Sequence, residues 1–214
     1  MTDRVSIPSA RHVRIVHLNG PTFQALATGD LPATNAVSPV PVTACFTALE
    51  QRRLWRMRSR QVELDPSSAD WITGVVWDEQ RQLAVGWAGY HGPPDASGMV
   101  EIGYAVDPAH RRRGYARAAL ETLLRRAARE PEVRTVRVTI SPDNAASYQL
   151  ASQYGFLRVG EQWDDEDGLE IIYEVVARQI SCRDTPTPAQ PLNHPAKPSR
   201  AGTLDTYLQS VAIR

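Results

Sequence analysis

The chain has 214 residues, equal numbers of acidic and basic side chains (24 of each) and 42% hydrophobic residues. This composition is typical of a globular protein with one ordinary domain and some additional length. No apolar run approaches the roughly 20 residues that a membrane helix requires, and the N-terminal sequence lacks the apolar centre of a signal peptide. We therefore expect a cytoplasmic protein that does not bind membranes.

The two cysteines, Cys45 and Cys182, lie far apart in the sequence. They match no metal-ligand spacing and offer no disulfide framework, so we expect inert thiols and no metal site. Only Lys197 among the basic residues is not arginine. A cluster of arginines in this chain is therefore weak evidence for function unless its position adds to it.

The first third of the chain predicts one strand followed by helices. The strand is expected in RHVRIVHLNG (11–20), and the amphipathic segment ACFTALEQRRLWRMRSRQ (44–61) predicts a basic helix. The arginines of this helix are expected to form its solvated face rather than a binding surface; they are Arg52, Arg53, Arg56, Arg58 and Arg60.

The middle of the chain predicts an antiparallel meander followed by helices that cross the sheet. Three segments rich in β-branched and aromatic residues are joined by short turns: WITGVVWD (71–78), LAVGWAGYHGPP (83–94) and GMVEIGYAVDP (98–108). Apolar residues then recur at spacings of three and four from Ala116 to Ala127, which predicts a helix. The last expected elements are the strand TVRVTI (135–140), the helix NAASYQLASQYGF (144–156) and the hairpin LRVGEQWDDEDGLEIIYEVV (157–176), with Asp167 and Gly168 at its turn.

The C-terminal segment differs from the rest in composition. Residues 181–214 contain five prolines and little apolar periodicity, which predicts a disordered tail. Its last dozen residues have apolar side chains at helical spacing, compatible with a short helix. We therefore divide the chain into a domain at 1–180 and a tail at 181–214.

Three consecutive arginines, Arg111, Arg112 and Arg113, stand between a predicted strand and a predicted helix. The start of a helix presents unpaired N–H groups and the positive end of the helix dipole, which favours anions. Gly114 allows close approach to the backbone, and Ala116 keeps the next position small. The pattern predicts a diphosphate site; the alternative is a solvated arginine run, which is unfavourable for the dipole.

The segment RRRGYA (111–116) matches the Q/R-x-x-G-x-G/A signature of the GNAT superfamily of acyl-CoA-dependent N-acyltransferases. SPDNAASYQLASQYGFLRVGE (141–161) resembles the second signature of that family, and its Asn-x-x-Ser form is most similar to the branch of ribosomal-protein N-terminal acetyltransferases. The resemblance covers roughly residues 13–176. It implies an α/β fold with a mixed, mostly antiparallel six- to seven-stranded sheet, splayed between the fourth and fifth strands and flanked by helices.

The same resemblance implies where acetyl-CoA would bind. The end of the fourth strand would pair with the pantetheine arm, the main chain of residues 112–117 would take the pyrophosphate, and the arginines would meet the adenosine phosphate. The implied cofactor-binding residues are Tyr104, Ala105, Val106, Arg111, Arg112, Arg113, Gly114, Tyr115, Ala116, Arg117, Asn144 and Ser147.

Three residues are the candidates for catalysis that the resemblance implies. Glu101 would act as the general base for the amine, and the N–H group of Val106 would stabilise the thioester oxygen. Many relatives use a tyrosine for the departing thiolate at the position that is Ala151 here. Ser147 is therefore the candidate for that role, with Tyr148 in reserve. His91 and His110 fall in predicted turns, and nothing in the sequence places them near the chemistry.

The predicted hairpin carries a run of acidic residues at the expected acceptor end of the site. Trp163, Asp164 and Asp165 are the candidate substrate-binding residues, because carboxylates attract a cationic acceptor and an indole ring offers a cation–π surface. The alternative is a solvated, charge-rich turn.

These observations favour an N-acetyltransferase that moves an acetyl group directly from acetyl-CoA to a primary amine, either a small cationic amine or a protein N-terminus. The first alternative is a non-catalytic acyl-CoA-binding module, which is supported by the absence of the family's tyrosine at Ala151. The second is nucleic-acid binding through the arginines, which the zero net charge disfavours. We expect no nucleic-acid partner, and a monomer or a homodimer.

Overall fold

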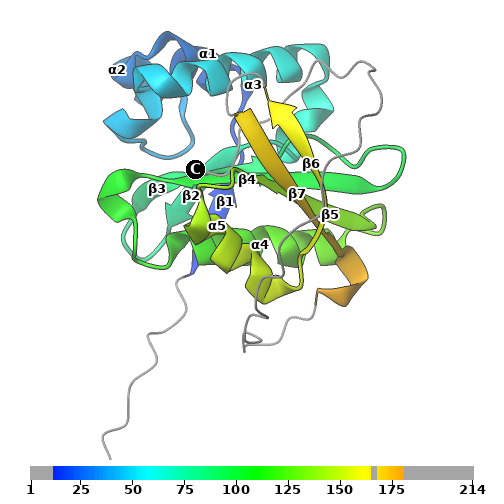
Figure 1. The fold of residues 1–214 in the computed structure, drawn as a ribbon. Helices are drawn as coiled ribbons and strands as arrows, with labels where there is room; N and C mark the ends of the chain where they lie inside the picture. Colours follow the sequence, from blue (N-terminus) through cyan, green and yellow to red (C-terminus); the bar gives the residue numbers. More distant parts are fainter. Residues whose placement is uncertain (1–11, 165–167, 181–214) are drawn as a thin grey trace, which may run out of the picture.

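The computed structural model describes residues 12–164 and 168–180, so the expected tail at 181–214 and the turn residues Asp165–Asp167 lie outside the described part. The described residues form an α/β fold around one seven-stranded sheet with the order β1-β2-β3-β4-β5-β7-β6 (Figure 1). Only the β4–β5 pair is parallel. The strands are β1 (Val13–Val16), β2 (Gly74–Asp78), β3 (Leu83–Tyr90), β4 (Met99–Val106), β5 (Thr135–Ile140), β6 (Leu157–Asp164) and β7 (Gly168–Val176).

Helices cover both faces of the sheet, with α1, α2 and α3 on one side and α4 and α5 on the other (Figure 1). The helices are α1 (Gly20–Thr28), α2 (Leu31–Val37), α3 (Arg52–Leu64), α4 (Tyr115–Arg129) and α5 (Ala145–Ala151). Short 3-10 segments are found at Ala44–Thr47, Leu49–Gln51, Pro66–Asp70, Pro108–His110, Ser152–Tyr154 and Ala177–Gln179. The strands and helices expected from the sequence are present, although the predicted basic helix begins later, at Arg52, after two 3-10 turns.

The face that carries α4 is built on the apolar spacing seen in the sequence. Leu120, Leu123 and Leu124 are almost fully buried against the sheet. Each such side chain contributes roughly 1.5–3 kcal/mol relative to an exposed one. At the start of α4, the Tyr115 hydroxyl donates a 2.7 Å hydrogen bond to Oδ2 of Asp78 at the end of β2. The helix is therefore fixed both by its apolar side and at its first residue.

The other face has an aromatic core and one buried cation. Phe46 stacks on Trp55 and meets Trp87 edge to face. The prediction that the arginines of α3 are solvated is wrong for Arg58, which is 3% exposed. Arg58 is buried because fixed acceptors surround its guanidinium: Nε donates to Thr73 (3.1 Å), and Nη1 donates to the Gln61 side chain (2.8 Å) and the His91 carbonyl (3.0 Å).

Strand β4 divides the sheet into two parts. It pairs with β3 through Val106, but it pairs with β5 only over three residues, the last being Glu101 opposite Arg137. Beyond that pair β4 runs on to Val106 and β5 to Ile140 without pairing to each other. The predicted splay between the fourth and fifth strands is therefore confirmed.

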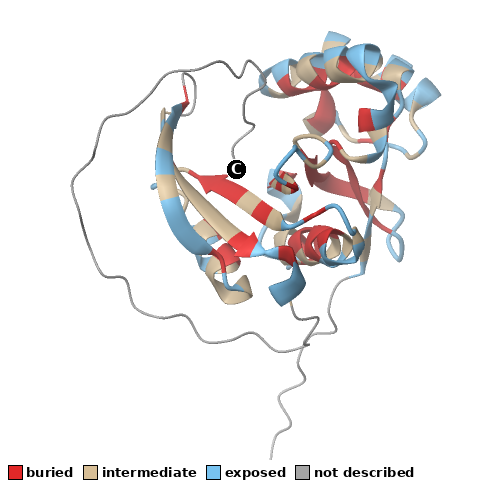
Figure 2. Ribbon diagram, turned by 90° about the vertical axis from the view of Figure 1, so that its right-hand side faces the viewer, coloured by how far each residue is buried: buried red, intermediate tan, exposed pale blue. Residues whose placement is uncertain are grey.

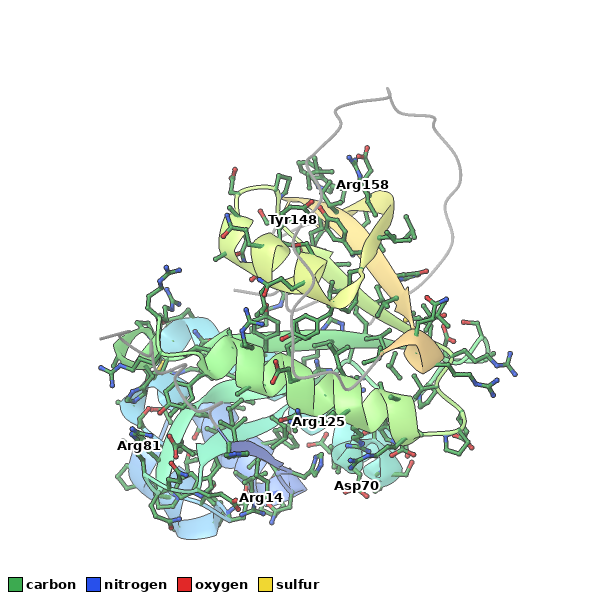
Figure 3. All side chains as sticks on the ribbon, turned by 90° about the horizontal axis from the view of Figure 1, so that it is seen from below. Arg14, Asp70, Arg81, Arg125, Tyr148 and Arg158 are labelled. Carbon is green, nitrogen blue, oxygen red and sulfur yellow. The ribbon has the colours of Figure 1, made fainter. Side chains whose placement is uncertain are left out.

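The β6–β7 hairpin forms the outer edge beside the splay. Most of β6 is exposed, in contrast to the buried inner strands (Figure 2). Seen from the α4 side, Tyr148 of α5 and Arg158 of β6 lie at the same end of the molecule (Figure 3). The Tyr148 ring packs on Tyr173 of β7 with centroids 5.5 Å apart, so α5 is attached to the hairpin side of the splay.

Candidate active site

The backbone of β4 presents polar groups to the splay. The N–H of Asp107 donates to Val85 (2.9 Å), and the C=O of Glu101 accepts from His91 (2.8 Å), so odd-numbered residues of β4 bond toward β3. Backbone groups alternate in direction along an antiparallel strand, so those of Tyr104 and Val106 face the β5 side instead. The strand has no β5 partner there. Of the three residues predicted to hold the pantetheine arm, Ala105 is the one whose N–H faces β3.

The turn after β4 has the features of an anion site. The carboxylate of Asp107 caps the N–H of Ala109, and Nε of Arg111 donates to the Val106 carbonyl (3.1 Å). Gly114 has a left-handed φ of +84°, and a Cβ built on it would have no atom within 4 Å, so the backbone is accessible there. The N–H of Ala118 donates to the Gly114 carbonyl at 3.1 Å, so the N–H groups of the first turn of α4, before Ala118, have no acceptor within the helix.

The side chains of this loop divide into anchored and exposed groups. Arg117 is tied to α5 and its extension, through Tyr154 (2.9 Å) and Gln153 (2.6 Å). Arg112 and Arg113 are exposed beside Gly114. The predicted phosphate site therefore combines backbone amides with exposed arginines, whereas the buried side chain of Tyr115 belongs to the core.

Across the splay, the start of α5 lies near β4. Asn144 caps the helix by accepting from the N–H of Ser147 at 3.1 Å. Ser147 is buried and lies near the hydroxyl of Tyr104, whose pKa is raised to about 12 by burial and lowered in part by Ser147. Ser147 and β4 are thus brought together, whereas Tyr148 packs against β7. Sequence reasoning missed that the Tyr104 side chain accompanies Ser147 here.

Glu101 is half-buried at the point where the splay begins. Its Oε1 accepts a 2.8 Å hydrogen bond from Thr139 on β5. Burial raises the pKa of Glu101, while Thr139 and the charges of Arg137 and Arg58 oppose that shift. A carboxylate with a raised pKa is a stronger base, so the position has the properties that a general base requires.

Two further residues near Glu101 were missed by sequence reasoning. The Nδ1 atom of His91 lies 3.6 Å from Oε1 of Glu101, although nothing in the sequence had placed His91 near the chemistry. Arg58 lies close enough to affect the pKa of Glu101, and burial lowers its own pKa to about 10. Neither could be found from local spacing, because α3 and the β3–β4 turn are brought to Glu101 only by the tertiary fold.

The hairpin separates the residues predicted to bind the acceptor. The register pairs Gln162 with Glu170 and Asp164 with Gly168, and Gln162 donates to Glu170 at 2.9 Å. Strand alternation places these even-numbered side chains on the same face of the sheet as Glu101. Trp163 lies on the opposite face and is 71% exposed. Asp164 therefore lies on the same face of the sheet as Glu101, and Trp163 does not. Asp165 lies outside the described residues.

Glu170 is a further carboxylate on the site side that sequence reasoning did not single out. It is 0% exposed, and it lies in the β7 half of the hairpin rather than in the acidic run. Its pairing with Gln162 across the two strands explains why only the register reveals it.

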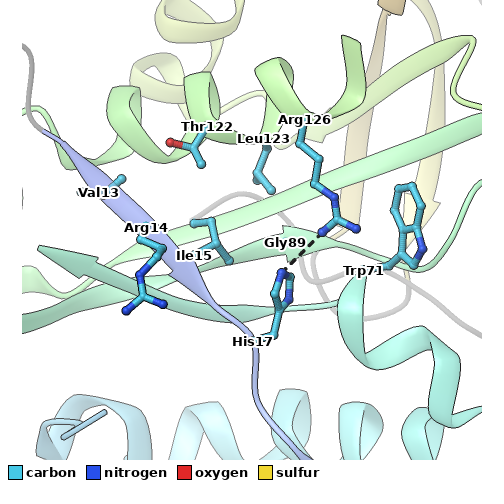
Figure 4. Close-up of a pocket in the computed structure, with 9 residues that line it drawn as sticks. All are labelled: Val13, Arg14, Ile15, His17, Trp71, Gly89, Thr122, Leu123 and Arg126. Atoms are coloured by element: carbon cyan, nitrogen blue, oxygen red, sulfur yellow. Dashed lines mark hydrogen bonds between the residues drawn. The ribbon is translucent and has the colours of Figure 1, made fainter. Parts of the chain in front are cut away.

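A separate cavity of about 250 Å³ lies between β1 and α4 (Figure 4), and Glu101 is not among the residues that line it. Its main cation, Arg126, already stacks over Trp71 and contacts the Asp70 carbonyl, His17 and Glu130. Burial and the charge of Arg126 lower the pKa of His17. The side chains of this cavity are thus engaged with one another, and it takes no part in the arrangement around the splay.

Within residues 12–164 and 168–180, no group of three or more His, Cys, Asp or Glu side chains is arranged to hold a metal ion. None of the helices described there is long and apolar enough to cross a membrane.

The sequence is similar to two curated proteins over part of its length. An uncharacterized N-acetyltransferase of Bacillus subtilis (strain 168), YjdG, is 36% identical over 83 residues, which is 39% of this chain and 49% of the relative. The L-2,4-diaminobutyric acid acetyltransferase of Streptomyces anulatus is 35% identical over 98 residues, which is 41% of this chain and 56% of the relative. The chain thus matches about half the length of each.

The fold is similar to that of solved acetyltransferases. The ribosomal-protein-S5-alanine acetyltransferase of Vibrio fischeri superposes with a TM-score of 0.54 over 79% of this chain and 96% of that one, at 13% sequence identity. The family model described as the acetyltransferase (GNAT) domain matches residues 22–157, well over half of the chain. These residues include β4, the Gly114 turn and the start of α5, and the chain therefore belongs to the GNAT acetyltransferase family.

Proposed function

We propose that the protein transfers an acetyl group from acetyl-CoA to a primary amine within a ternary complex. The observation that carries this proposal is the end of β4–β5 pairing at Glu101, beyond which Tyr104 and Val106 turn their backbone groups into the splay. Acetyl-CoA fits the splay because the accessible Gly114 turn at the end of β4 can receive its pyrophosphate. Arg112 and Arg113 can then meet the remaining phosphate.

Glu101 takes the proton of the amine in this proposal. An ammonium group has no lone pair, so the acceptor must lose a proton before it can attack the thioester carbon. The proton moves to the carboxylate of Glu101, the new N–C bond forms, and the C–S bond breaks. The N–H of Val106 supports the charge that develops on the thioester oxygen.

The departing thiolate is stabilised from the α5 side of the splay. Ser147 is the proposed donor, and the adjacent phenol of Tyr104 keeps its proton at neutral pH because its pKa is about 12. The pair compensates for Ala151, the buried residue that stands where many relatives carry a tyrosine.

Direct transfer is supported by the state of Cys45. Burial, together with the charge of Asp107, raises the pKa of Cys45 to about 11. The thiolate is the nucleophilic form of cysteine, so this thiol is inert at neutral pH. The proposal therefore assigns no acyl-enzyme intermediate to Cys45. The other cysteine, Cys182, lies outside the described residues.

The acceptor that this site favours is cationic. Asp164 and Glu170 are buried carboxylates on the same face of the sheet as Glu101. Carboxylates on this side of the site favour an acceptor that carries a second positive charge. A small diamine or a basic protein N-terminus fits this description, and the partial match to a diaminobutyrate acetyltransferase agrees with the first.

The test is release of free CoA from acetyl-CoA in the presence of single amines, with the product identified by mass spectrometry. The panel contains 2,4-diaminobutyrate, a linear polyamine, an aminoglycoside, a peptide with a basic N-terminus and a neutral primary amine. Turnover that is faster with the cationic acceptors supports the proposal. Tight acetyl-CoA binding without turnover on any amine would favour the alternative, a non-catalytic acyl-CoA-binding module, which Ala151 supports.

A further inference from the structure

His91 lies beside the carboxylate of Glu101, although it belongs to the turn that follows β3. Its Nδ1 atom is 3.6 Å from Oε1 of Glu101, and the side chains of the two residues are 16% and 15% exposed. The same oxygen accepts the 2.8 Å hydrogen bond from Thr139. These two contacts therefore meet at the same carboxylate oxygen, Oε1.

The backbone of His91 is fixed by three hydrogen bonds that do not involve its imidazole. Its N–H donates to the Glu101 carbonyl at 2.8 Å, and its own carbonyl accepts from Arg58 (3.0 Å) and from Gln61 (2.8 Å). The two donors come from α3, which packs on this face of the sheet. The imidazole is thus held next to Glu101 by its main chain, and a substitution at position 91 changes the side chain without removing these bonds.

Charged groups from three elements face Glu101 and His91. Arg58 approaches from α3, and Arg137 approaches from β5 and is paired with Glu174 of β7 at 2.6 Å. Burial favours the neutral form of Glu101, whereas a general base must be ionised before it can accept a proton. A donor on Oε1 stabilises the ionised form and also fixes the rotamer of the carboxylate.

We infer that His91 is a positioning residue for Glu101: its Nδ1 atom, at ion-pair distance from Oε1, acts together with the hydrogen bond from Thr139 to favour the ionised carboxylate and to fix its orientation. The inference rests on the proposed function, because it assigns His91 to the same proton transfer. His91 itself does not touch the substrate. Its contribution is to the fraction of Glu101 that is ionised and correctly oriented.

The test compares three substitutions in the full chain. In asparagine the side-chain amide nitrogen occupies nearly the position of the histidine Nδ1 atom. In glutamine it occupies nearly the position of the histidine Nε2 atom, and leucine has no hydrogen-bond donor. We expect His91→Leu and His91→Gln to lower kcat about 10-fold and to move the acid limb of the kcat/KM profile up by about one pH unit. His91→Asn should have a kcat and an acid limb close to those of the wild type. KM for acetyl-CoA should be unchanged in all three variants.

The control is His17→Leu, which makes the same change in an exposed histidine beside the separate cavity between β1 and α4. It should leave kcat and the pH profile as in the wild type. Melting temperatures of all variants are measured alongside. Equal losses in the Asn, Gln and Leu variants, or wild-type profiles in all three, would overturn the positioning role.

A second readout does not require turnover. The carboxyl carbon of Glu101 is followed by NMR as the pH is changed, with Glu101→Gln used for assignment. An upward shift of the Glu101 pKa in His91→Leu that is absent in His91→Asn supports the inference, and identical titrations contradict it. If the wild type transfers no acetyl group to any amine, the proposed function fails, while this titration still decides whether His91 controls Glu101.

Discussion

The two sides of strand β4 are built in opposite ways. Toward β3 the strand is paired through Val106, and the two backbones approach closely at Gly86, where a Cβ would lie 2.1 Å from the Ala105 carbonyl oxygen. Toward β5 the pairing ends at Glu101, and the residues beyond it face the splay. One strand therefore combines a rigid attachment with an unpaired edge.

The comparison shows how a sheet can expose backbone groups without losing its order. Unpaired backbone in the middle of a sheet is costly, and it persists where the surroundings hold it. Here the closed side fixes β4, and the 15-residue helix α4 covers the strand on one face. In the proposed function, the unpaired edge is a preformed site for a substrate with its own donors and acceptors, and preformed polar groups lower the cost of binding.

The largest expected effect comes from blocking the open side. Gly114→Glu should abolish acetyl-CoA binding, because it adds bulk and negative charge where the pyrophosphate is expected to lie. Calorimetric titration with acetyl-CoA measures the loss. Gly155→Glu is the matched control, since Gly155 also has a left-handed φ (+78°) and a Cβ there would meet only Val175 at 4.0 Å. Near-normal affinity in Gly114→Glu would show that the loop is not the phosphate site.

The next effect concerns the residue at which pairing ends. Glu101→Gln should lower kcat about 100-fold at neutral pH, the usual scale for a positioned base, with little change in acetyl-CoA affinity. Steady-state rates with the best amine of the panel measure it. Glu161→Gln is the control, because Glu161 is an exposed residue of β6 that pairs with Arg158. A wild-type rate in Glu101→Gln would remove Glu101 from the mechanism.

The raised pKa of Glu101 also predicts a pH dependence. Burial favours its protonated form, so the carboxyl binds a proton at a higher pH than an ordinary glutamate does. Glu101 is ionised, and can accept a proton, at a pH above the pKa that it has in the folded protein. This ability is lost as the pH falls through that pKa. The rate of acetyl transfer should therefore begin to fall at a pH above the pKa of an ordinary glutamate. A fall that occurs only below that value would show that Glu101 does not act as the base.

The hairpin across the splay is tested with a smaller expected change. Replacing Asp164 and Asp165 together by asparagine should raise KM for a dicationic amine by roughly 10-fold while leaving KM for acetyl-CoA unchanged, because attraction of the second charge is lost. KM for the wild type should also rise with salt, since charge attraction is screened. A double variant that treats neutral and dicationic amines as the wild type does would leave the hairpin as a turn only.

The sequence predicted the fold because most elements are encoded locally. The apolar spacing of α4 and the β-branched run Thr135–Ile140 match the observed helix and strand. The turn at Gly114 between β4 and α4 was predictable for the same reason, since strand, glycine and helix follow one another in the sequence. The surroundings of Glu101 were not, because Arg58 and His91 come from other elements and their roles depend on packing. The sequence could not show that Trp163 and Glu170 lie on opposite faces of the hairpin, because only the register decides which side each residue faces.

The smallest expected effect tests the closed side. Gly86→Ala should lower the free energy of unfolding by about 1–3 kcal/mol, because the new Cβ would overlap the Ala105 carbonyl oxygen and force β3 and β4 apart. Denaturant unfolding measures the change. Gly160→Ala is the matched control in strand β6, where a Cβ would make only an ordinary contact with Ile172 at 3.8 Å and the stability should change little or rise slightly. If the two variants proved equally stable, the close approach of β3 would not be what holds β4, and the rigidity of the unpaired edge would have to come from α4 instead.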